Sequence, residues 1–192
     1  MNCKRVVIVG IPGVGKTTVV DKVKDILHSK GINTKYVIFG SIMMKEAEKL
    51  GLNDRDGMRH LPVNTQRKLQ VAASSEISKI EAEILLVDTH LFIKTNEGYW
   101  PGLPFDVATT LSPTHIFLII AAPKEIISRR LNDTSRRRDN ITENDVIEEL
   151  EIAQNMLCSL SIITGAAMMQ IQNANAKFDK AANSIVSALG VI

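Results

Sequence analysis

The sequence has few cysteines and no long apolar run. Cys3 and Cys158 lie far apart and form no C-x-x-C pair, which argues against a disulfide framework or a zinc site. The longest apolar stretches, such as residues 116–122, are far shorter than the roughly 20 residues of a membrane-spanning helix. The N-terminus also lacks the apolar segment of a secretory signal peptide. We therefore expect an intracellular protein in a reducing compartment, without a membrane partner.

The chain also has little net charge. Its 23 Lys and Arg residues nearly balance 21 Asp and Glu residues, which leaves a formal charge of +2. Domains that bind nucleic acid usually carry a strong basic footprint, so we expect no nucleic-acid partner. The histidines show no metal-ligand spacing, and we expect them to be ordinary polar residues.

The pattern of apolar residues predicts an α/β fold in a single domain of 192 residues. Short runs rich in β-branched residues predict strands at 5–9, 34–39, 84–87, 116–120 and 168–171. Amphipathic segments predict helices at 63–81, 142–163 and 177–189. Thr142 and Asp145 have the spacing of a capping box at the start of the second of these helices. Strands that alternate with helices favour parallel pairing, with the sheet buried on both faces.

The clearest motif, G-x-x-x-x-G-K-T, directly follows the first predicted strand and directly precedes a helical pattern. Its glycines let backbone N–H groups approach a polyphosphate, and the helix N-terminus attracts the negative charge. The lysine is suited to reach the β- and γ-phosphates, and the first threonine hydroxyl to ligate Mg²⁺. A chance Gly-rich turn does not explain strand, spacing and helix together, so we expect a site for ATP or GTP. The residues are Gly10, Ile11, Pro12, Gly13, Val14, Gly15, Lys16, Thr17 and Thr18.

A cluster of arginines forms a second candidate for anion binding. Planar guanidinium groups suit bidentate contacts with phosphate oxygens. We interpret residues 132–141 as a surface flap whose arginines close over the transferring phosphoryl group and expel water. A solvated basic face or a nucleic-acid patch is the alternative on charge alone. The cluster consists of Arg129, Arg130, Arg136, Arg137 and Arg138.

Two further polar motifs are candidates for the same site. The sequence D-R-D-G-M-R at 54–59 is not a calcium loop, because Met58 stands at a ligand position and the glycine comes one residue early. Arg59 could instead anchor an acceptor phosphate, although a solvated turn explains the motif equally well. Asp88 follows a predicted strand, where the carboxyl ends of parallel strands line a ligand crevice. It is placed to influence Mg²⁺ or a nucleotide, unless it simply ends the strand.

Taken together and in order, the motifs resemble those of the archaeal-type adenylate kinases over nearly the whole chain. The P-loop alone occurs in many NTPases, whereas the other blocks are far more specific. These blocks are F-G-S at 39–41, D-R-D-G-M-R at 54–59, D-T-H at 88–90, G-Y-W-P-G-L-P at 98–104, and R-R-L-N-D at 129–133 with R-D at 138–139.

The resemblance implies a three-layer α/β/α P-loop kinase fold with a five-stranded parallel sheet. It also implies a helical AMP-binding lobe at about 40–80 and a short Arg-rich lid at about 132–142. The implied activity is Mg²⁺-dependent, reversible phosphoryl transfer from ATP to AMP, giving two ADP, in a cytoplasmic enzyme that is often trimeric.

The resemblance also implies roles for individual residues. The P-loop would hold the donor phosphates, and the loop 172–175 would lie beside the donor adenine. The catalytic residues would be Lys16, Arg129, Arg136 and Arg138. The substrate-binding residues would be Phe39, Gly40, Ser41 and Arg59, with Asp88, Thr89 and His90 near the centre.

Two positions depart from the family pattern. Gln154 stands where an arginine is usual, so one phosphate contact is either missing or supplied by Arg137. Trp100 stands where an aliphatic residue is common, which changes either a subunit contact or a surface position. The lid has no cysteine, so we expect no structural zinc there.

Two other functions compete with this interpretation. The same P-loop would serve a kinase that acts on another nucleoside monophosphate or on a small metabolite. An NTP-dependent RNA-processing factor would use the arginines to hold an RNA backbone, with an affinity that falls steeply with salt. The near-neutral charge of the domain speaks against the second of these functions.

Overall fold

The computed structural model describes residues 3–52, 57, 61–95, 97–132, 141–175 and 177–191. A parallel five-stranded sheet in the order β2-β3-β1-β6-β7 lies at its centre. The five predicted strands and the α/β class are confirmed. Each strand differs from its predicted range by one residue at one or both ends, and β2 is the one that is shorter, since it ends at Ile38 and Phe39 already begins a helix. The strands are β1 (Lys4–Val9), β2 (Thr34–Ile38), β3 (Ile84–Asp88), β6 (His115–Ile120) and β7 (Ala167–Gln172).

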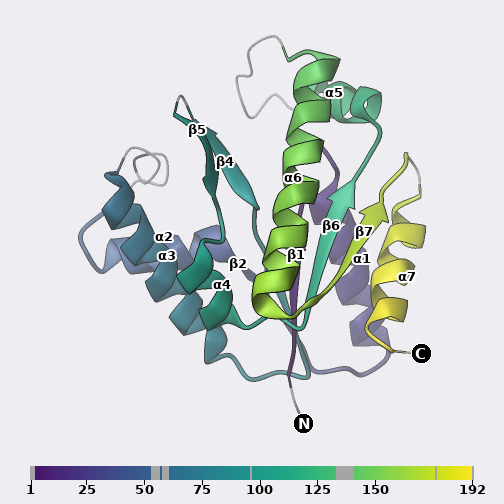
Figure 1. Cartoon of the computed structure of the whole chain (residues 1–192). Coiled ribbons are helices and arrows are strands. Elements are labelled where there is room, and N and C mark those ends of the chain that lie inside the picture. Colours follow the sequence, from purple (N-terminus) through teal and green to yellow (C-terminus); the bar gives the residue numbers. More distant parts are fainter. Residues whose placement is uncertain are drawn as a thin grey trace.

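Helices cover both faces of the sheet, as Figure 1 shows. α1 and α7 pack together on one face, whereas α3, α4 and α6 pack side by side on the other. α2 packs on α3, and α5 packs on α6. This is the three-layer arrangement that the motifs implied. The described helices are α1 (Lys16–Ser29), α2 (Phe39–Glu48), α3 (Val63–Ser78), α4 (Phe105–Leu111), α5 (Pro123–Asn132), α6 (Glu143–Thr164) and α7 (Phe178–Ala188).

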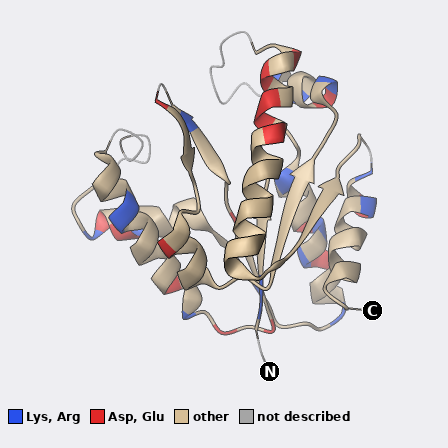
Figure 2. Cartoon of the chain, viewed as in Figure 1, with Lys and Arg blue, Asp and Glu red and all other residues tan. Residues whose placement is uncertain are grey.

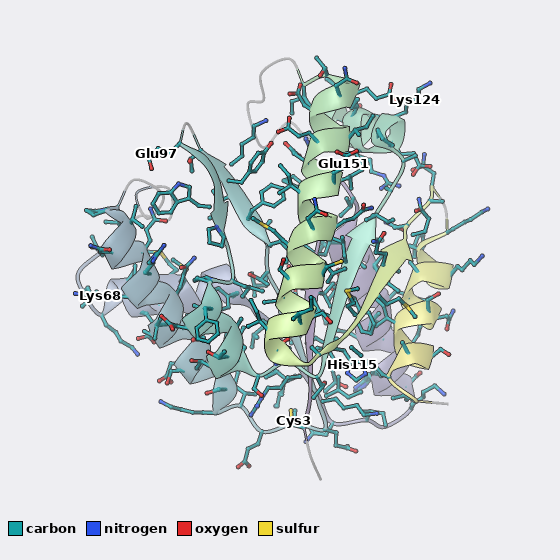
Figure 3. The ribbon with its side chains drawn as sticks, in the orientation of Figure 1. Cys3, Lys68, Glu97, His115, Lys124 and Glu151 are labelled. Atoms are coloured by element: carbon teal, nitrogen blue, oxygen red, sulfur yellow. The ribbon has the colours of Figure 1, made fainter. Side chains whose placement is uncertain are left out.

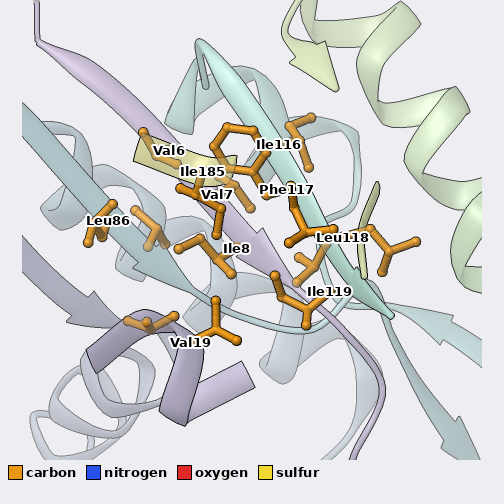
Figure 4. Close-up of a cluster of buried hydrophobic side chains, with 14 of the residues drawn as sticks. Val6, Val7, Ile8, Val19, Leu86, Ile116, Phe117, Leu118, Ile119 and Ile185 are labelled. Atoms are coloured by element: carbon orange, nitrogen blue, oxygen red, sulfur yellow. The ribbon is translucent and has the colours of Figure 1, made fainter. Parts of the chain in front are cut away.

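The central strands form the core because they are almost entirely apolar. Figure 4 shows Val6, Val7 and Ile8 of β1 among the apolar side chains of the neighbouring strands and of α1 and α7. Successive residues of a strand point to opposite faces, so β1 contributes to the core on both sides of the sheet. Such continuous apolar runs are typical of parallel strands that helices cover on both faces. The three central strands, β1, β3 and β6, therefore form the buried centre of the sheet.

The capping box predicted for α6 is confirmed. The backbone N–H of Asp145 donates to Thr142 Oγ1 at 3.2 Å, and the backbone N–H of Thr142 donates to Asp145 Oδ2 at 2.9 Å. Acidic side chains gather toward the N-terminal end of this helix (Figure 2), where they complement the helix dipole. The helix ends at Gly165, whose φ of 69° is left-handed. Within the described part of the chain, no helix is long and apolar enough to cross a membrane.

The predicted helices at 63–81 and 177–189 exist but are shorter than expected. α3 ends at Ser78 because the N–H groups of Lys79 and Ile80 close its last turn onto Glu76 and Ile77. α7 spans Phe178–Ala188, so the outermost residues of the prediction are the caps of the helix.

An antiparallel hairpin of β4 (Phe92–Thr95) and β5 (Gly98–Pro101) was not predicted from the sequence. Its strands have four residues each, and neither has the continuous apolar run that marked the central strands. β4 is mostly exposed and β5 is mostly half-buried. Figure 1 shows the hairpin standing between the helices α2 and α3 and the helix α6. It therefore forms one wall of the space next to the α2–α3 lobe.

The lobe formed by α2 and α3 has a small apolar cluster of its own. Ala47 and Leu69 are buried there, and Met43, Leu52 and Leu61 pack against them. The assignment of residues 40–80 to AMP binding stays a prediction. The predicted lid at 132–142 falls mostly on residues 133–140, which lie outside the described part of the chain.

Candidate functional site

The P-loop occupies the turn between β1 and α1, as the sequence predicted. Its apolar members Ile11 and Val14 are buried and anchor the turn to the core. Glycine is required at position 15 for two reasons. Gly15 has a φ of 79°, and a Cβ on it would lie 2.5 Å from the side-chain nitrogen of Asn173. The turn is therefore closely packed against the loop that follows β7.

The start of α1 is suited to bind an anion. Gly15 is the N-cap and provides no side-chain cap, and the first turn contains no acidic residue. The side chains of Thr17 and Thr18 are exposed in this turn. Free N–H groups at a helix N-terminus, together with the helix dipole, favour a phosphate at this position.

Lys16, Asp88 and Tyr36 form a hydrogen-bonded network beside the P-loop. The register pairs Asp88 with both Ile8 and Ile38, so the carboxyl ends of β1, β2 and β3 meet there. Lys16 Nζ forms an ion pair with Asp88 Oδ1 and donates to the backbone oxygen of Thr89 at 3.0 Å. The Tyr36 hydroxyl donates to Asp88 Oδ2 at 3.1 Å.

The environment of Tyr36 keeps its hydroxyl protonated. Burial raises the pKa of Tyr36 well above its ordinary value, and the charge of Asp88 and the hydrogen bond to it act in the same direction. The hydroxyl is therefore a donor to the carboxylate at neutral pH. Tyr36 could not be predicted from the sequence, because only the strand pairing brings it to Asp88.

The two arginines at the end of α5 have different surroundings. Arg129 Nη1 donates to the backbone oxygens of Gly13 and Val14 at 3.3 and 3.1 Å. Arg130 is buried, and its Nη2 forms an ion pair with Glu149 Oε2 at 2.6 Å. Arg129 thus lies at the edge of the P-loop. Arg130 joins α5 to α6, and its Nε also donates to the backbone oxygen of Pro12 in the P-loop at 2.8 Å. Arg136, Arg137 and Arg138 lie outside the described residues.

Asn173 belongs to the loop 172–175 that the resemblance implied, but the sequence did not single it out. It follows β7 in the loop that was predicted to lie beside the donor adenine, and it is only 4% exposed. Its side-chain nitrogen donates to the backbone oxygen of Val14 at 2.8 Å. Arg129 Nη2 also donates to the side-chain oxygen of Asn175 at 2.7 Å. The P-loop and the β7–α7 loop are therefore held together, and the position of Asn173 after a strand was the available signal.

The residues predicted on the AMP side and near the centre of the site are only partly brought together. Asp88 and Thr89 are buried next to Lys16, and His90 follows them with an exposed side chain. Phe39 opens α2, and its side chain is buried in the main core, so its role in substrate binding stays a prediction. The remaining predicted residues are Gly40 and Ser41 in the first turn of α2, and Arg59, which lies outside the described residues.

A cavity of about 280 Å³ opens between the start of α3 and the hairpin. Trp100, which the sequence suggested was a subunit or surface contact, lines this cavity. On the α3 side of the cavity, the side-chain nitrogen of Gln66 donates to the backbone oxygen of Leu61 at 2.8 Å. Figure 3 shows Glu97 at the tip of the hairpin. The lining residues are Leu61, Val63, Gln66, Ile93, Thr95, Glu97 and Trp100.

Gln154, the departure from the family pattern on α6, does not pair with the P-loop. Its side-chain nitrogen donates to Gln170 Oε1 on β7 at 3.3 Å. The amide therefore links α6 to the edge strand of the sheet.

A glycine-rich turn joins the first strand to the first helix at the carboxyl edge of a parallel sheet. This arrangement defines a P-loop nucleotide-binding protein. Comparison with known proteins agrees with this class. The model of a family described as an AAA domain matches residues 9–147. A shikimate kinase from Bacteroides thetaiotaomicron is similar with a TM-score of 0.60 and 11% identity, over 97% of this chain and 98% of that one. At this identity, the likeness shows the fold alone.

Relatives with higher identity specify the family. An adenylate kinase of Sulfurisphaera tokodaii is 41% identical over 189 residues, which are 95% of this chain and 97% of the relative. One of Methanocaldococcus jannaschii is 39% identical over 98% of this chain and 100% of the relative. The chain therefore belongs to the archaeal-type adenylate kinase family, a family of phosphotransferases. The resemblance inferred from the motifs is confirmed.

Proposed function

We propose that this enzyme transfers a phosphoryl group reversibly between Mg²⁺-bound ATP and AMP, giving two ADP. The observation that carries the proposal is the position of Lys16. It begins the helix that follows the P-loop and lies beside Asp88 at the carboxyl edge of the sheet. ATP would bind there as the phosphoryl donor, with its adenine near the β7–α7 loop that Asn173 fixes to the P-loop.

The cavity between α3 and the hairpin is proposed to hold the base of AMP. A nucleotide base is a flat, largely apolar group, and Trp100, Ile93 and Leu61 offer apolar surface for it. Gln66 and Glu97 add the few polar groups that such sites use to orient a ligand. Arg59 would neutralise the phosphate of AMP.

The chemistry requires little more than alignment and charge neutralisation. The acceptor phosphate is already an anionic nucleophile, so no general base is needed. Lys16 would leave Asp88 and contact the donor phosphates, and α1 would direct its N–H groups at them. Arg129 lies close enough to the P-loop to hold its shape, and Arg136 and Arg138 would close over the transferring group.

Thr17 and Asp88 fit a magnesium ion. Both offer oxygen ligands, which Mg²⁺ prefers, and they lie near the same edge of the sheet. When bound with ATP, the ion neutralises part of the phosphate charge. We further propose a cytoplasmic homotrimer, as the family resemblance implies. Light scattering should then give a mass of three times 21.2 kDa.

The direct test is a coupled assay of ADP formation from ATP with AMP, CMP, UMP or GMP. We expect Mg²⁺-dependent activity with a strong preference for AMP. Lys16→Ala should lower kcat by at least about 10²-fold, because a charge contact made in the transition state is lost. Lys22→Ala is the matched control, since Lys22 lies on the same helix in an exposed pair with Asp179. This variant should keep full activity.

Other outcomes of this assay would favour the competing functions. Faster turnover with CMP or UMP would indicate a different nucleoside monophosphate kinase. Absence of AMP-dependent ADP production, together with RNA binding that weakens steeply with salt, would indicate an RNA-processing factor.

A further inference from the structure

The carboxylate of Asp88 has a separate partner for each of its oxygens. Lys16 pairs with Oδ1, and the Tyr36 hydroxyl donates to Oδ2 at 3.1 Å. The carboxylate lies in a nearly closed environment, since Asp88 is only 7% exposed. A buried charge is stable only when it is paired and hydrogen-bonded, so both partners matter. Tyr36 has no role in the phosphoryl transfer described above.

The phenol ring of Tyr36 is itself held in place. Lys24, on α1, places its ammonium 4.8 Å from the centre of the ring, a cation–π arrangement. Strand pairing fixes the backbone, because β2 and β3 align Ile38 with Asp88. The hydroxyl therefore approaches Asp88 from a rigid strand.

Nucleotide binding and Asp88 compete for the same ammonium group. Under the proposed function, which this inference extends, Lys16 must give up Asp88 and Thr89 to reach the donor phosphates. The carboxylate then loses a cation, and only the Tyr36 hydroxyl still bonds it among the contacts described here. Without that hydroxyl, Lys16 would be the sole donor for both oxygens and would be held more tightly.

We propose that Tyr36 is a positioning residue of the donor site. Its hydroxyl holds Asp88 and thereby limits how strongly Asp88 retains Lys16 when no nucleotide is bound to the P-loop. Tyr36 does not touch the substrate. It acts on ATP affinity through Asp88, and its effect should be largest when no metal ion is present to take over the carboxylate.

The test measures the dissociation constant of ATP by calorimetry in EDTA, so it needs neither turnover nor metal. Tyr36→Phe keeps the ring over which Lys24 lies and removes only the hydroxyl. We expect this change to raise the Kd of metal-free ATP about tenfold, the effect of losing roughly one hydrogen bond to a charged group. The Kd of AMP should not change. Tyr99→Phe is the matched control, because its hydroxyl bonds the exposed Glu148 and its loss should leave both constants unchanged.

A double-mutant cycle separates this role from packing. Asp88→Asn removes the competing charge and should lower the Kd of metal-free ATP. Tyr36→Phe added to Asp88→Asn should then change the Kd less than about twofold, because residues that act through one another are not additive. An unchanged Kd in Tyr36→Phe, or an undiminished effect in the Asp88→Asn background, would overturn the proposal.

The same data distinguish a failure of the proposed function. Suppose that the wild-type chain binds ATP and the variants change its Kd as expected, but the wild-type chain makes no ADP from AMP. The acceptor assignment then fails, and the role of Tyr36 stands. If the wild-type chain does not bind ATP, both are refuted. If the Tyr36→Phe variant is unstable in thermal melts, the Asp88→Asn variant still provides a test. The proposal is rejected if Asp88→Asn does not lower the Kd of metal-free ATP.

Discussion

The buried ion pair of Arg130 and Glu149 allows a quantitative prediction about stability. Arg130 is 6% exposed, its Nε donates to the backbone oxygen of Pro12 at 2.8 Å, and its Nη2 pairs with Glu149 at 2.6 Å. Arg130→Met would leave the Glu149 carboxylate buried without its cation. Breaking one side of a buried pair destabilises a protein by about 3–5 kcal/mol.

The predicted loss is large enough to measure by thermal unfolding. For a chain of this size, each kcal/mol shifts the Tm by about 2–4 °C, so Arg130→Met should lower it by about 6–20 °C. Lys22→Met is the control, because the pair of Lys22 with Asp179 is exposed and water screens its charges, so its loss should hardly change the Tm. The double change Arg130→Met with Glu149→Leu should recover much of the loss, since it removes the uncompensated charge. If Arg130→Met lowered the Tm no more than Lys22→Met, the pair would not be what holds α5 to α6.

Three further changes test other parts of the account. Gly15→Ala should weaken ATP binding in calorimetry by at least about tenfold without affecting AMP, because its φ of 79° is strained for alanine and the new Cβ meets Asn173. Trp100→Ala should raise the KM for AMP about tenfold with little change in kcat, because it removes binding surface and not a transition-state contact; an unchanged KM would place the base elsewhere. Burial, and to a lesser degree the charge of Lys4, lowers the pKa of His115 below 6.5. Folding then favours the neutral ring, so its contribution to stability is complete above pH 6.5 and is lost as the pH falls. Melts between pH 5 and 8 should show this loss in the wild-type chain and a smaller one in His115→Gln.

The features that the sequence predicted are those with local signals. The central strands are continuous apolar runs, the P-loop is a contiguous motif, and the capping box of Thr142 and Asp145 spans one helical turn. The hairpin was missed because its strands have only four residues each and mix apolar with polar residues, so neither forms a continuous apolar run.

The remaining contacts of the site join residues that are distant in sequence. Tyr36 reaches Asp88 only through the pairing of β2 with β3, and Asn173 reaches Val14 only because both follow strands of one sheet. Arg129 and Arg130 illustrate the same limit. They are adjacent and identical in type, yet Arg129 is half-buried beside the P-loop, whereas Arg130 is buried between the P-loop and α6. Successive residues on a helix point in different directions, so position on α5 decides their roles.

The measurement that tests the central claim most directly is a crystal structure with a dinucleoside pentaphosphate, in which five phosphates join two adenosines. The account predicts that one adenosine lies near Asn173 with its phosphates along the P-loop. It predicts that the other lies in the cavity beside Trp100, with the phosphate chain passing Lys16. Density for one adenosine only, or for the second adenosine outside that cavity, would contradict the account.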